Sequence, residues 1–495
     1  LPRAIAEAEG YEEDHPWRTV LQEYANADTA MTIQLWKILL DQLEERGLME
    51  IYRARMELLP VIMKMKSRGI AADKRRIKEL RDKFSEEGTE YEQVCINLSD
   101  GELESLPAGS TSNALRIVIF DNFQLESPKK TANGNPSMDK SVLDHWISSL
   151  DPVSKEWRFV RSLRNYRKRR TALGYLESYV NFGKQFPGRR KNLLRMFPDF
   201  NPTGTDTLRW SSRNPNAQQI SKQDGVNLRY CFGPMPDREW WSLDYNNIEL
   251  RIPAYESGEE EMIKLFEAPN EPPFFGSNHL LIFSVLHPDK YDHDDPKGLL
   301  KAKKKYASTW YQWTKNGNFA VQYGAVAESG TADRAYHVNG AQEEVEKRFK
   351  NIGRLNQKMI QLASDNGFVE TVPDKEVDPH RGYPILCTKS RWGSVKPTIP
   401  LNYHIQGTAC WITSMAMIDT QSYFDWLNFD CERADHFIVM NVHDEIVIDL
   451  PFVENKGNLH IVTEVKRIME RRGDCVGIPL TCGVEYHPNN WSESE

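Results

Sequence analysis

Two widely separated acidic segments constrain the fold of this 495-residue chain most strongly. In the first, the apolar run 240–243 predicts a buried strand that ends at Asp244. In the second, the β-rich runs 437–442 and 446–450 flank the polar turn 443–445 and predict a hairpin. A single aspartate at a strand end is most often a turn former. Two acidic sites from distant parts of one chain, however, can bind a pair of divalent metal ions and support phosphoryl transfer.

Both segments resemble the polymerase motifs of the family A DNA polymerases. The family writes its first motif as Asp-Tyr-x-x-Ile-Glu-Leu-Arg and its last as Val-His-Asp-Glu, and both are complete here at Asp244–Arg251 and Val442–Glu445. The resemblance runs from about residue 50 to the C-terminus, with further motifs in the same order. It implies an α+β, right-hand polymerase fold, with an antiparallel-sheet palm and a largely helical thumb and fingers.

Composition limits the expected partners and location. The formal net charge is −8, so a chain that binds a polyanion must concentrate its positive charge locally. No apolar run approaches the roughly 20 residues that a membrane span requires. Seven scattered cysteines without a Cys-x-x-Cys pair indicate reduced thiols rather than a zinc site. A cytoplasmic location is therefore expected, in a bacterial host if the source is a phage or virus, as the resemblance suggests.

The order of the motifs divides the chain into five predicted parts. Residues 1–45 are predicted to be a remnant of an exonuclease-like domain, because Tyr24-x-x-x-Asp28 matches its closing motif. The Asp-x-Glu pair that this chemistry also needs is missing from residues 1–23, so no proofreading is expected in this chain. The other parts are the thumb and its base helices at 46–195, the palm at 196–254 and 426–495, and the fingers at 255–425.

The resemblance implies roles for the acidic motif residues. Asp244 and Asp444 are predicted to bind two Mg²⁺ ions, which Mn²⁺ can replace, with the Tyr245 carbonyl as a further ligand. Glu445 is a supporting acid, and His443 is expected to contact the primer end. The implied reaction is in-line attack of a primer 3′-hydroxyl on the α-phosphate of a deoxynucleoside triphosphate, with pyrophosphate leaving.

The segment 306–324 predicts a helix that binds the incoming nucleotide. Lys315, Phe319 and Tyr323 are four residues apart and therefore share one helix face. Such spacing is more often typical of a core face, but the family's helix carries the same residues, followed by glycine, here Gly324. The resemblance implies that Lys315 neutralises the triphosphate and can protonate the pyrophosphate, while the two aromatic side chains pack against sugar and base.

The same helix departs from the family at Tyr311, where an arginine that contacts the outer phosphates is expected. Tyrosine offers one neutral donor, so weakened nucleotide binding is expected, and four lysines between 301 and 305 could supply part of the charge. Glu249 is predicted to crowd the 2′ position of the sugar and so select deoxynucleotides. His279 is a candidate triphosphate contact, although such a histidine is usually solvated and an alternative alignment moves the contact nearer Phe275.

Candidate DNA contacts fall in three stretches. Residues 201–221 resemble a primer-template-binding stretch of the family, with Leu208 in place of a glycine. Seven cations without an acid between 158 and 170 predict a phosphate-contacting helix, although a charge run is usually a solvated face. The candidates are Arg209, Asn216, Gln218 and Arg229 near the primer end, Asn402 and Gln406 on a later helix, and Arg161, Arg164 and Lys168 on the cationic helix.

Two other functions stay open. A single-subunit, phage-type RNA polymerase shares the palm, but Glu249 argues against it because a ribose selector would not crowd the 2′ position. A non-catalytic DNA-binding homologue is opposed by the intact Asp244, Asp444 and Lys315. The expected partners are primer-template DNA and deoxynucleoside triphosphates, without a membrane. The chain is expected to be a monomer that replication accessory proteins can join.

Overall fold

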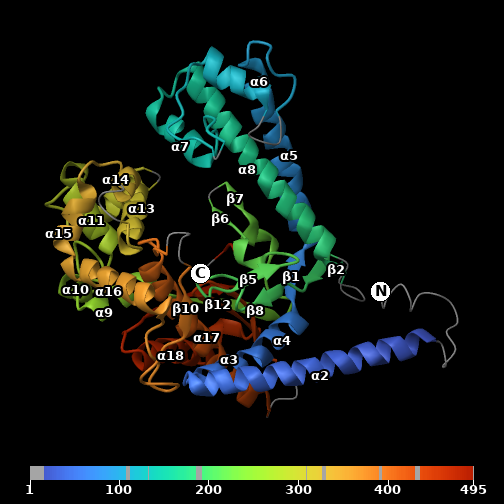
Figure 1. Cartoon of the computed structure of the whole chain (residues 1–495). Coiled ribbons are helices and arrows are strands. Elements are labelled where there is room, and N and C mark those ends of the chain that lie inside the picture. The colour runs from blue at the N-terminus through green and yellow to red at the C-terminus, as the bar shows by residue number, and fades with distance from the viewer. Residues whose placement is uncertain are drawn as a thin grey trace.

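The computed structural model describes residues 16–106, 112–131, 133–185, 192–223, 225–307, 309–325, 330–388, 393–429 and 435–493. A helical thumb and helical fingers rise from opposite sides of a palm that contains the main sheet (Figure 1). This arrangement confirms the α+β, right-hand fold that the motifs predict. No helix in these described ranges combines the length and the apolar character needed to cross a membrane.

The palm is built on four antiparallel strands in the order β11-β12-β8-β13. Trp240, Trp241 and Leu243 lie in the central strand β8 and are buried, as is the single polar residue among them, Ser242. Two long helices, α17 and α18, pack on each other and on the outer strands. The palm elements are β8 (Arg238–Tyr245), β11 (Phe437–Val442), β12 (Glu445–Pro451), β13 (Cys482–His487), α17 (Pro400–Phe429), η6 (Glu454–Lys456) and α18 (Leu459–Cys475).

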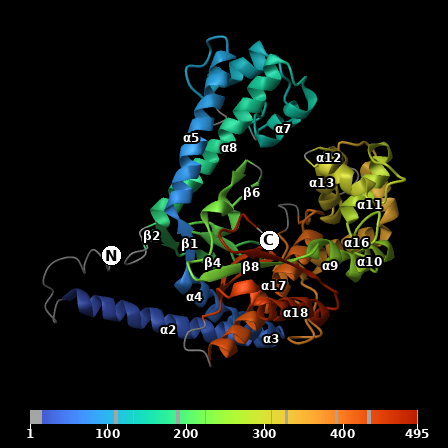
Figure 2. The same ribbon diagram turned by 180° about the vertical axis from the view of Figure 1, so that it is seen from behind.

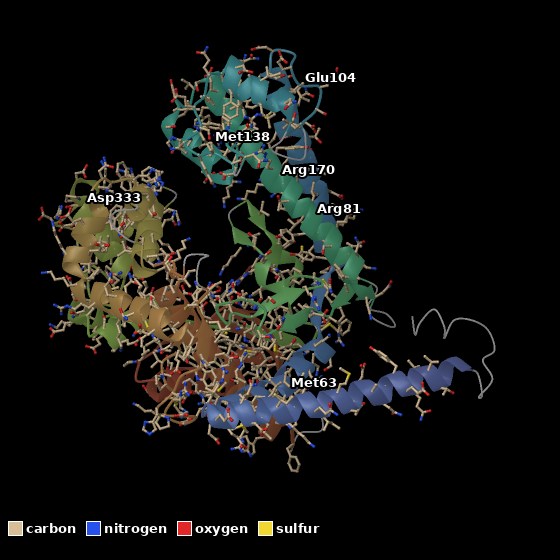
Figure 3. The ribbon with its side chains drawn as sticks, in the orientation of Figure 1. Met63, Arg81, Glu104, Met138, Arg170 and Asp333 are labelled. Carbon is tan, nitrogen blue, oxygen red and sulfur yellow. The ribbon has the colours of Figure 1, made fainter. Side chains whose placement is uncertain are left out.

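Two long helices that pack along their length, α5 and α8, form the stalk of the thumb. Figure 3 shows Arg81 on α5 and Arg170 on α8. The far end of the stalk carries its own apolar core, which includes Trp146 and Phe159. The thumb elements are α5 (Lys74–Asn97), α6 (Asn113–Arg116), η1 (Ile117–Asn122), α7 (Lys140–Ser149) and α8 (Lys155–Phe182), with a base sheet of β1 (Ile70–Asp73), β3 (Leu193–Met196) and β2 (Lys184–Gln185).

The fingers are helical and contain two apolar clusters. Their helix α13 packs against α11 and α14. The approach to α14 is close, because a Cβ built on Gly317 would lie 2.2 Å from the Tyr336 ring. The fingers elements are α9 (Ile248–Ser257), α10 (Glu260–Glu267), α11 (Asn278–Leu286), η4 (Pro288–Lys290), α12 (Gly298–Lys305), α13 (Trp310–Gln322), α14 (Thr331–Tyr336), α15 (Ala341–Arg348), α16 (Lys350–Asn366), β9 (Phe368–Glu370) and β10 (Pro384–Leu386).

Two helices from separate predicted parts of the chain pack together. α4 falls in the predicted thumb and its base helices at 46–195, and α17 falls in the predicted fingers at 255–425, yet α4 packs against both α17 and β11. Both helices contribute to one shared apolar core, and the five-part division of the chain stays a prediction. The remaining elements are α2 (Pro16–Glu45), α3 (Met49–Met56), α4 (Leu58–Arg68), β4 (Asp199–Asn201), β5 (Ser211–Arg213), η2 (Ala217–Gln219), β6 (Lys222–Gln223), β7 (Val226–Asn227) and η3 (Leu228–Cys231).

The predicted exonuclease remnant corresponds in part to α2. Residues 1–15 lie outside the described residues. From Pro16 onward the segment is one long helix that extends along the palm and away from it, as the view from behind also shows (Figure 2). Its assignment as an exonuclease remnant stays a prediction.

Candidate active site

The two predicted acidic sites meet at one end of the palm sheet. Asp244 is the last residue but one of the central strand β8 and is paired in register with Glu445, the first residue of β12. Val442 pairs with Glu445 across the β11–β12 hairpin, so the turn consists of His443 and Asp444 alone. The left-handed backbone of His443 (φ 62°) makes this tight turn and places Asp444 beside the end of β8.

The charges of these acids are mutually unfavourable. Asp244 is exposed at the surface, but nearby protein atoms displace part of the water around its carboxyl group. This desolvation, together with the charges of Asp444 and Glu445, raises the pKa of Asp244 to about 8. Desolvation also raises the pKa of Asp444, with Arg209 opposing the shift. Neighbouring carboxylates that disfavour each other's charge are a good environment for a cation.

The donor set fits magnesium. No group of three or more His, Cys, Asp or Glu side chains suited to a metal occurs in the described part of the chain. Asp244 and Asp444 are the two predicted carboxylate ligands, and the Tyr245 carbonyl is the predicted third ligand. Mg²⁺ usually binds through one or two carboxylates and completes its octahedron with water and substrate phosphates.

Glu445 is held by a buried ion pair. Both of its oxygens accept from the Arg229 guanidinium, at 3.2 and 2.9 Å, and the Trp491 indole N–H donates to the same carboxylate at 3.3 Å. The Arg229 guanidinium also lies 3.7 Å from the Trp491 ring centroid. In this structure the Arg229 guanidinium positions Glu445, and its predicted contact with DNA stays a prediction. Trp491 was missed, because no sequence signal links it to a residue so far away in the chain.

Amide side chains stabilise the hairpin turn through hydrogen bonds. Asn441 donates to the carbonyls of His443 at 2.9 Å and Glu445 at 3.3 Å. The buried Gln218 donates to Asn441 at 3.3 Å, and Asn216 caps the short η2 helix by accepting from the Gln218 N–H. The two predicted DNA contacts thus shape the turn in this structure. Asn441 was missed, although an amide within an apolar strand is a detectable signal.

Five predicted site residues line one small cavity beside these acids. The cavity holds ≈ 20 Å³, which suits a water molecule rather than a sugar. Arg209 and the Tyr323 hydroxyl both contact the Glu249 carboxylate and close the space between palm and fingers. The predicted site residues that line this cavity are Arg209, Glu249, Gln406, His443 and Asp444.

The backbone near this cavity turns at Leu208, where the family has glycine. Leu208 adopts a left-handed conformation (φ 63°) and is buried in the palm core. Its carbonyl accepts a hydrogen bond from the Cys410 thiol at 2.9 Å. A non-glycine residue is therefore held in a strained backbone conformation, which apolar packing stabilises.

The predicted nucleotide-binding face of α13 is present. The Lys315 ammonium lies 5.9 Å from the Phe319 ring, and the rings of Phe319 and Tyr323 stack at 5.8 Å with 16° between their planes. Gly324 follows with φ 80°, and a Cβ there would lie 2.8 Å from the Asn356 side chain. This approach and the backbone conformation both require glycine.

His279 lies beside this face, near the start of α11. Its Nδ1 is 2.9 Å from the Asn318 amide nitrogen, and its ring is 5.3 Å from Phe319. Burial, followed by the charges of Lys315 and Lys303, lowers the pKa of His279 to about 3. The histidine is therefore a neutral, buried member of the fingers rather than a solvated loop residue. Tyr336, which donates to Asn318 at 2.7 Å, was missed from the sequence.

The cations of α8 divide among several environments. Arg169 is buried against Glu87, and Arg161 lies over the Trp157 ring at 4.8 Å. Arg164 pairs with Asp144 at 2.8 Å. The cations of α8 thus do not all lie on one phosphate-binding face, because the helix also packs against the thumb core. Their contacts with phosphate stay predictions. Arg164, Arg167 and Lys168 nevertheless line a cavity of ≈ 340 Å³, together with Tyr175 and Gln219 near the palm.

The last predicted DNA contacts lie on α17. Gln406 lines the small cavity beside Glu249 and Asp444. The side-chain oxygen Oδ1 of Asn402 is buried without a hydrogen-bond partner among the described residues. Contacts of both side chains with DNA stay predictions.

The palm sheet with its paired acids, together with the helix that carries Lys315, Phe319 and Tyr323, is typical of the right-hand fold class. The comparison with protein families identifies the branch. The model described as DNA polymerase family A matches residues 74–493, and the chain belongs to this family.

Similar proteins include DNA polymerase I from Treponema pallidum, which is 26% identical over 95% of this chain and 43% of its own length. DNA polymerase I from Bacillus caldotenax is 24% identical over 95% of this chain and 49% of its own length. A solved structure, the POL domain of Pol1 from M. smegmatis in complex with DNA primer-template and dNTP, has a TM-score of 0.71 at 20% identity and covers 91% of this chain and 72% of that one. The chain spans about half the length of the curated relatives it matches. These relatives are bacterial and lend no support to a phage source.

Proposed function

We propose that this chain is a template-directed DNA polymerase that extends a primer 3′-hydroxyl with deoxynucleotides. The observation that carries the proposal is the convergence of Asp244 and Asp444 at one sheet end, beside a helix face with Lys315 and two stacked aromatic rings. Membership of family A supports it, as does the similarity to a polymerase domain whose structure was solved with primer-template and dNTP. The proposed unit is a monomer in the bacterial cytoplasm, and accessory proteins can join it.

The side chains divide the work of this reaction. Asp244 and Asp444 would hold two Mg²⁺ ions, which would activate the attacking hydroxyl and stabilise the departing oxyanion. Arg229 holds Glu445 in place behind them through a buried ion pair. Lys315 binds the triphosphate and can give a proton to the leaving pyrophosphate, because its ammonium group projects from the exposed end of the face. The Phe319 and Tyr323 rings offer an apolar surface to the sugar and base.

Primer extension with purified protein tests the proposal. A labelled primer-template is incubated with magnesium and either deoxy- or ribonucleoside triphosphates. Template-dependent extension with deoxynucleotides is expected. Preference for ribonucleotides would favour the RNA polymerase alternative, and DNA binding without extension by either set would favour a non-catalytic homologue.

Replacement of Glu249 by alanine is expected to relax sugar selection. The carboxylate lies between Arg209 and the Tyr323 hydroxyl, so its removal opens space where a 2′-hydroxyl would be placed. The ratio of ribonucleotide to deoxynucleotide incorporation should rise roughly 10-fold or more. The measurement is kcat/KM for single additions of matched ribo- and deoxynucleotides.

The Glu249→Gln variant is the matched control, because it keeps the size of the side chain and removes only its charge. Its incorporation ratio should remain near that of the wild type. An alanine variant with an unchanged ratio would place the sugar elsewhere.

A further inference from the structure

Two lysines from different helices converge beside the buried, neutral His279. Lys315 extends from α13, and Lys303 extends from the last turn of α12. Both ammonium charges lower the pKa of His279, after burial, so both lie within electrostatic range of its ring. Within the described ranges no carboxylate forms an ion pair with either lysine. Two unpaired cations on one side of a site create a positive field that attracts an anion.

Tyr311 determines where Lys303 lies. The Lys303 ammonium is 5.5 Å from the centroid of the Tyr311 ring, a cation–π arrangement. Tyr311 itself is buried and packs 6.2 Å from the Phe283 ring. The tyrosine ring is therefore part of an apolar cluster of the fingers, and its face supports the lysine.

The two cations follow the same helix face. Tyr311 and Lys315 are separated by four residues, which is about one turn and 6 Å along α13. Along this face of α13, the rings of Tyr323 and Phe319 are followed by Lys315. Tyr311 comes next, and Lys303 lies over its ring. A ligand whose apolar part stacks on the rings would thus place successive negative groups against Lys315 and Lys303.

Neighbouring lysines lack this placement. Lys301 pairs with Asp295 at 2.7 Å, and Lys305 lies over the ring of Tyr306 at 5.1 Å. In the part of the chain that the structure describes, no ion pair or ring contact involves Lys304. Of the four lysines between 301 and 305, Lys303 is therefore the one that contacts α13.

We propose that Lys303 binds the terminal phosphate groups of the incoming nucleoside triphosphate, with the Tyr311 ring positioning it and Lys315 binding the phosphates nearer the sugar. This inference rests on the proposed polymerase function. Lys303 of α12 would thus supply the positive charge that α13 lacks at Tyr311. Charge-assisted contacts to phosphate are strong enough for one such cation to affect nucleotide affinity measurably.

Single-nucleotide addition by Lys303→Met, Lys303→Arg and Lys304→Met tests the assignment. Lys303→Met should raise the KM for a deoxynucleoside triphosphate by about 10-fold, with kcat changed much less, because it removes a charge-assisted contact. Lys303→Arg should restore the wild-type KM, and the exposed Lys304→Met should match the wild type. The apparent KM for pyrophosphate in the reverse reaction should rise in parallel for Lys303→Met.

A binding measurement separates this contact from a structural effect. The affinity of each variant for the next correct nucleotide is measured on a dideoxy-terminated primer, and the melting temperature is measured alongside. Lys303→Met should weaken nucleotide affinity about 10-fold without changing the melting temperature. Equal KM values for Lys303→Met and Lys304→Met, or a change in kcat alone, would overturn the inference while leaving the polymerase function intact. Absence of extension by the wild type would instead overturn the proposed function.

Discussion

Asp244→Ala and Asp444→Ala are each expected to reduce primer extension at least about 1,000-fold while leaving duplex binding nearly unchanged. Both carboxylates lie at the end of the palm sheet, where the proposed metal ions need negative ligands. The DNA itself is a polyanion, so removal of an acid does not remove a DNA contact. The measurements are single-turnover extension in magnesium and a gel-shift titration with the same primer-template.

A matched control comes from the same sheet. Glu485 is on β13, next to β8, and its exposed carboxylate pairs with Lys222 at 3.0 Å. Glu485→Ala should extend primers like the wild type. Substantial extension by either aspartate variant in magnesium would contradict the metal assignment.

Protein stability distinguishes lost chemistry from lost folding. The pKa of Asp244 is raised to about 8 in the folded protein, above its ordinary value of 3.8, so the charged form is disfavoured by folding near pH 7. The contribution of this group is favourable at low pH and is lost as the pH rises toward 8. Asp244→Asn should therefore melt no lower than the wild type in a chelating buffer at pH 8. A marked fall in melting temperature would indicate a structural role instead.

Phe319→Tyr is expected to increase acceptance of dideoxynucleotides by roughly one to two orders of magnitude. The half-buried Phe319 ring lies between His279 and Tyr323 and offers no polar atom at its edge. A nucleotide without a 3′-hydroxyl thus leaves a polar group of the closed site unsatisfied, which typically costs about 1–3 kcal/mol. Tyrosine adds a hydroxyl near that position and replaces the lost contact. Chain termination at matched dideoxy-to-deoxy ratios measures the change.

Phe274→Tyr provides the control for an added hydroxyl elsewhere in the fingers. Phe274 is half-buried and lines a separate cavity with Glu261 and Lys264. Its variant should discriminate against dideoxynucleotides as the wild type does. Equal termination by Phe319→Tyr and the wild type would show that Phe319 does not lie beside the sugar, and the whole α13 face would then need reassignment.

The main elements of the fold and the acidic centre were predictable because their signals are local. The apolar run before Asp244 specifies a buried strand, and the two β-rich runs around His443 and Asp444 specify a hairpin. The i, i+4 spacing of Lys315, Phe319 and Tyr323 specifies one helix face. The packing of α4 against α17 and β11 was not predictable in this way, because an apolar face does not reveal which element covers it.

The motifs that resemble family A, together with short-range periodicity, predicted from the sequence alone which residues would bind metal, sugar and phosphate. Only the tertiary structure decided which partners their long side chains reach. In the folded chain Arg229 pairs with Glu445, and His279 is buried against α13. Lys303 lies over the Tyr311 ring, whereas its neighbouring lysines do not. These outcomes depend on how separate helices and strands pack around a shared core. Residues adjacent in sequence point in different directions from a helix, so composition and spacing cannot distinguish among them.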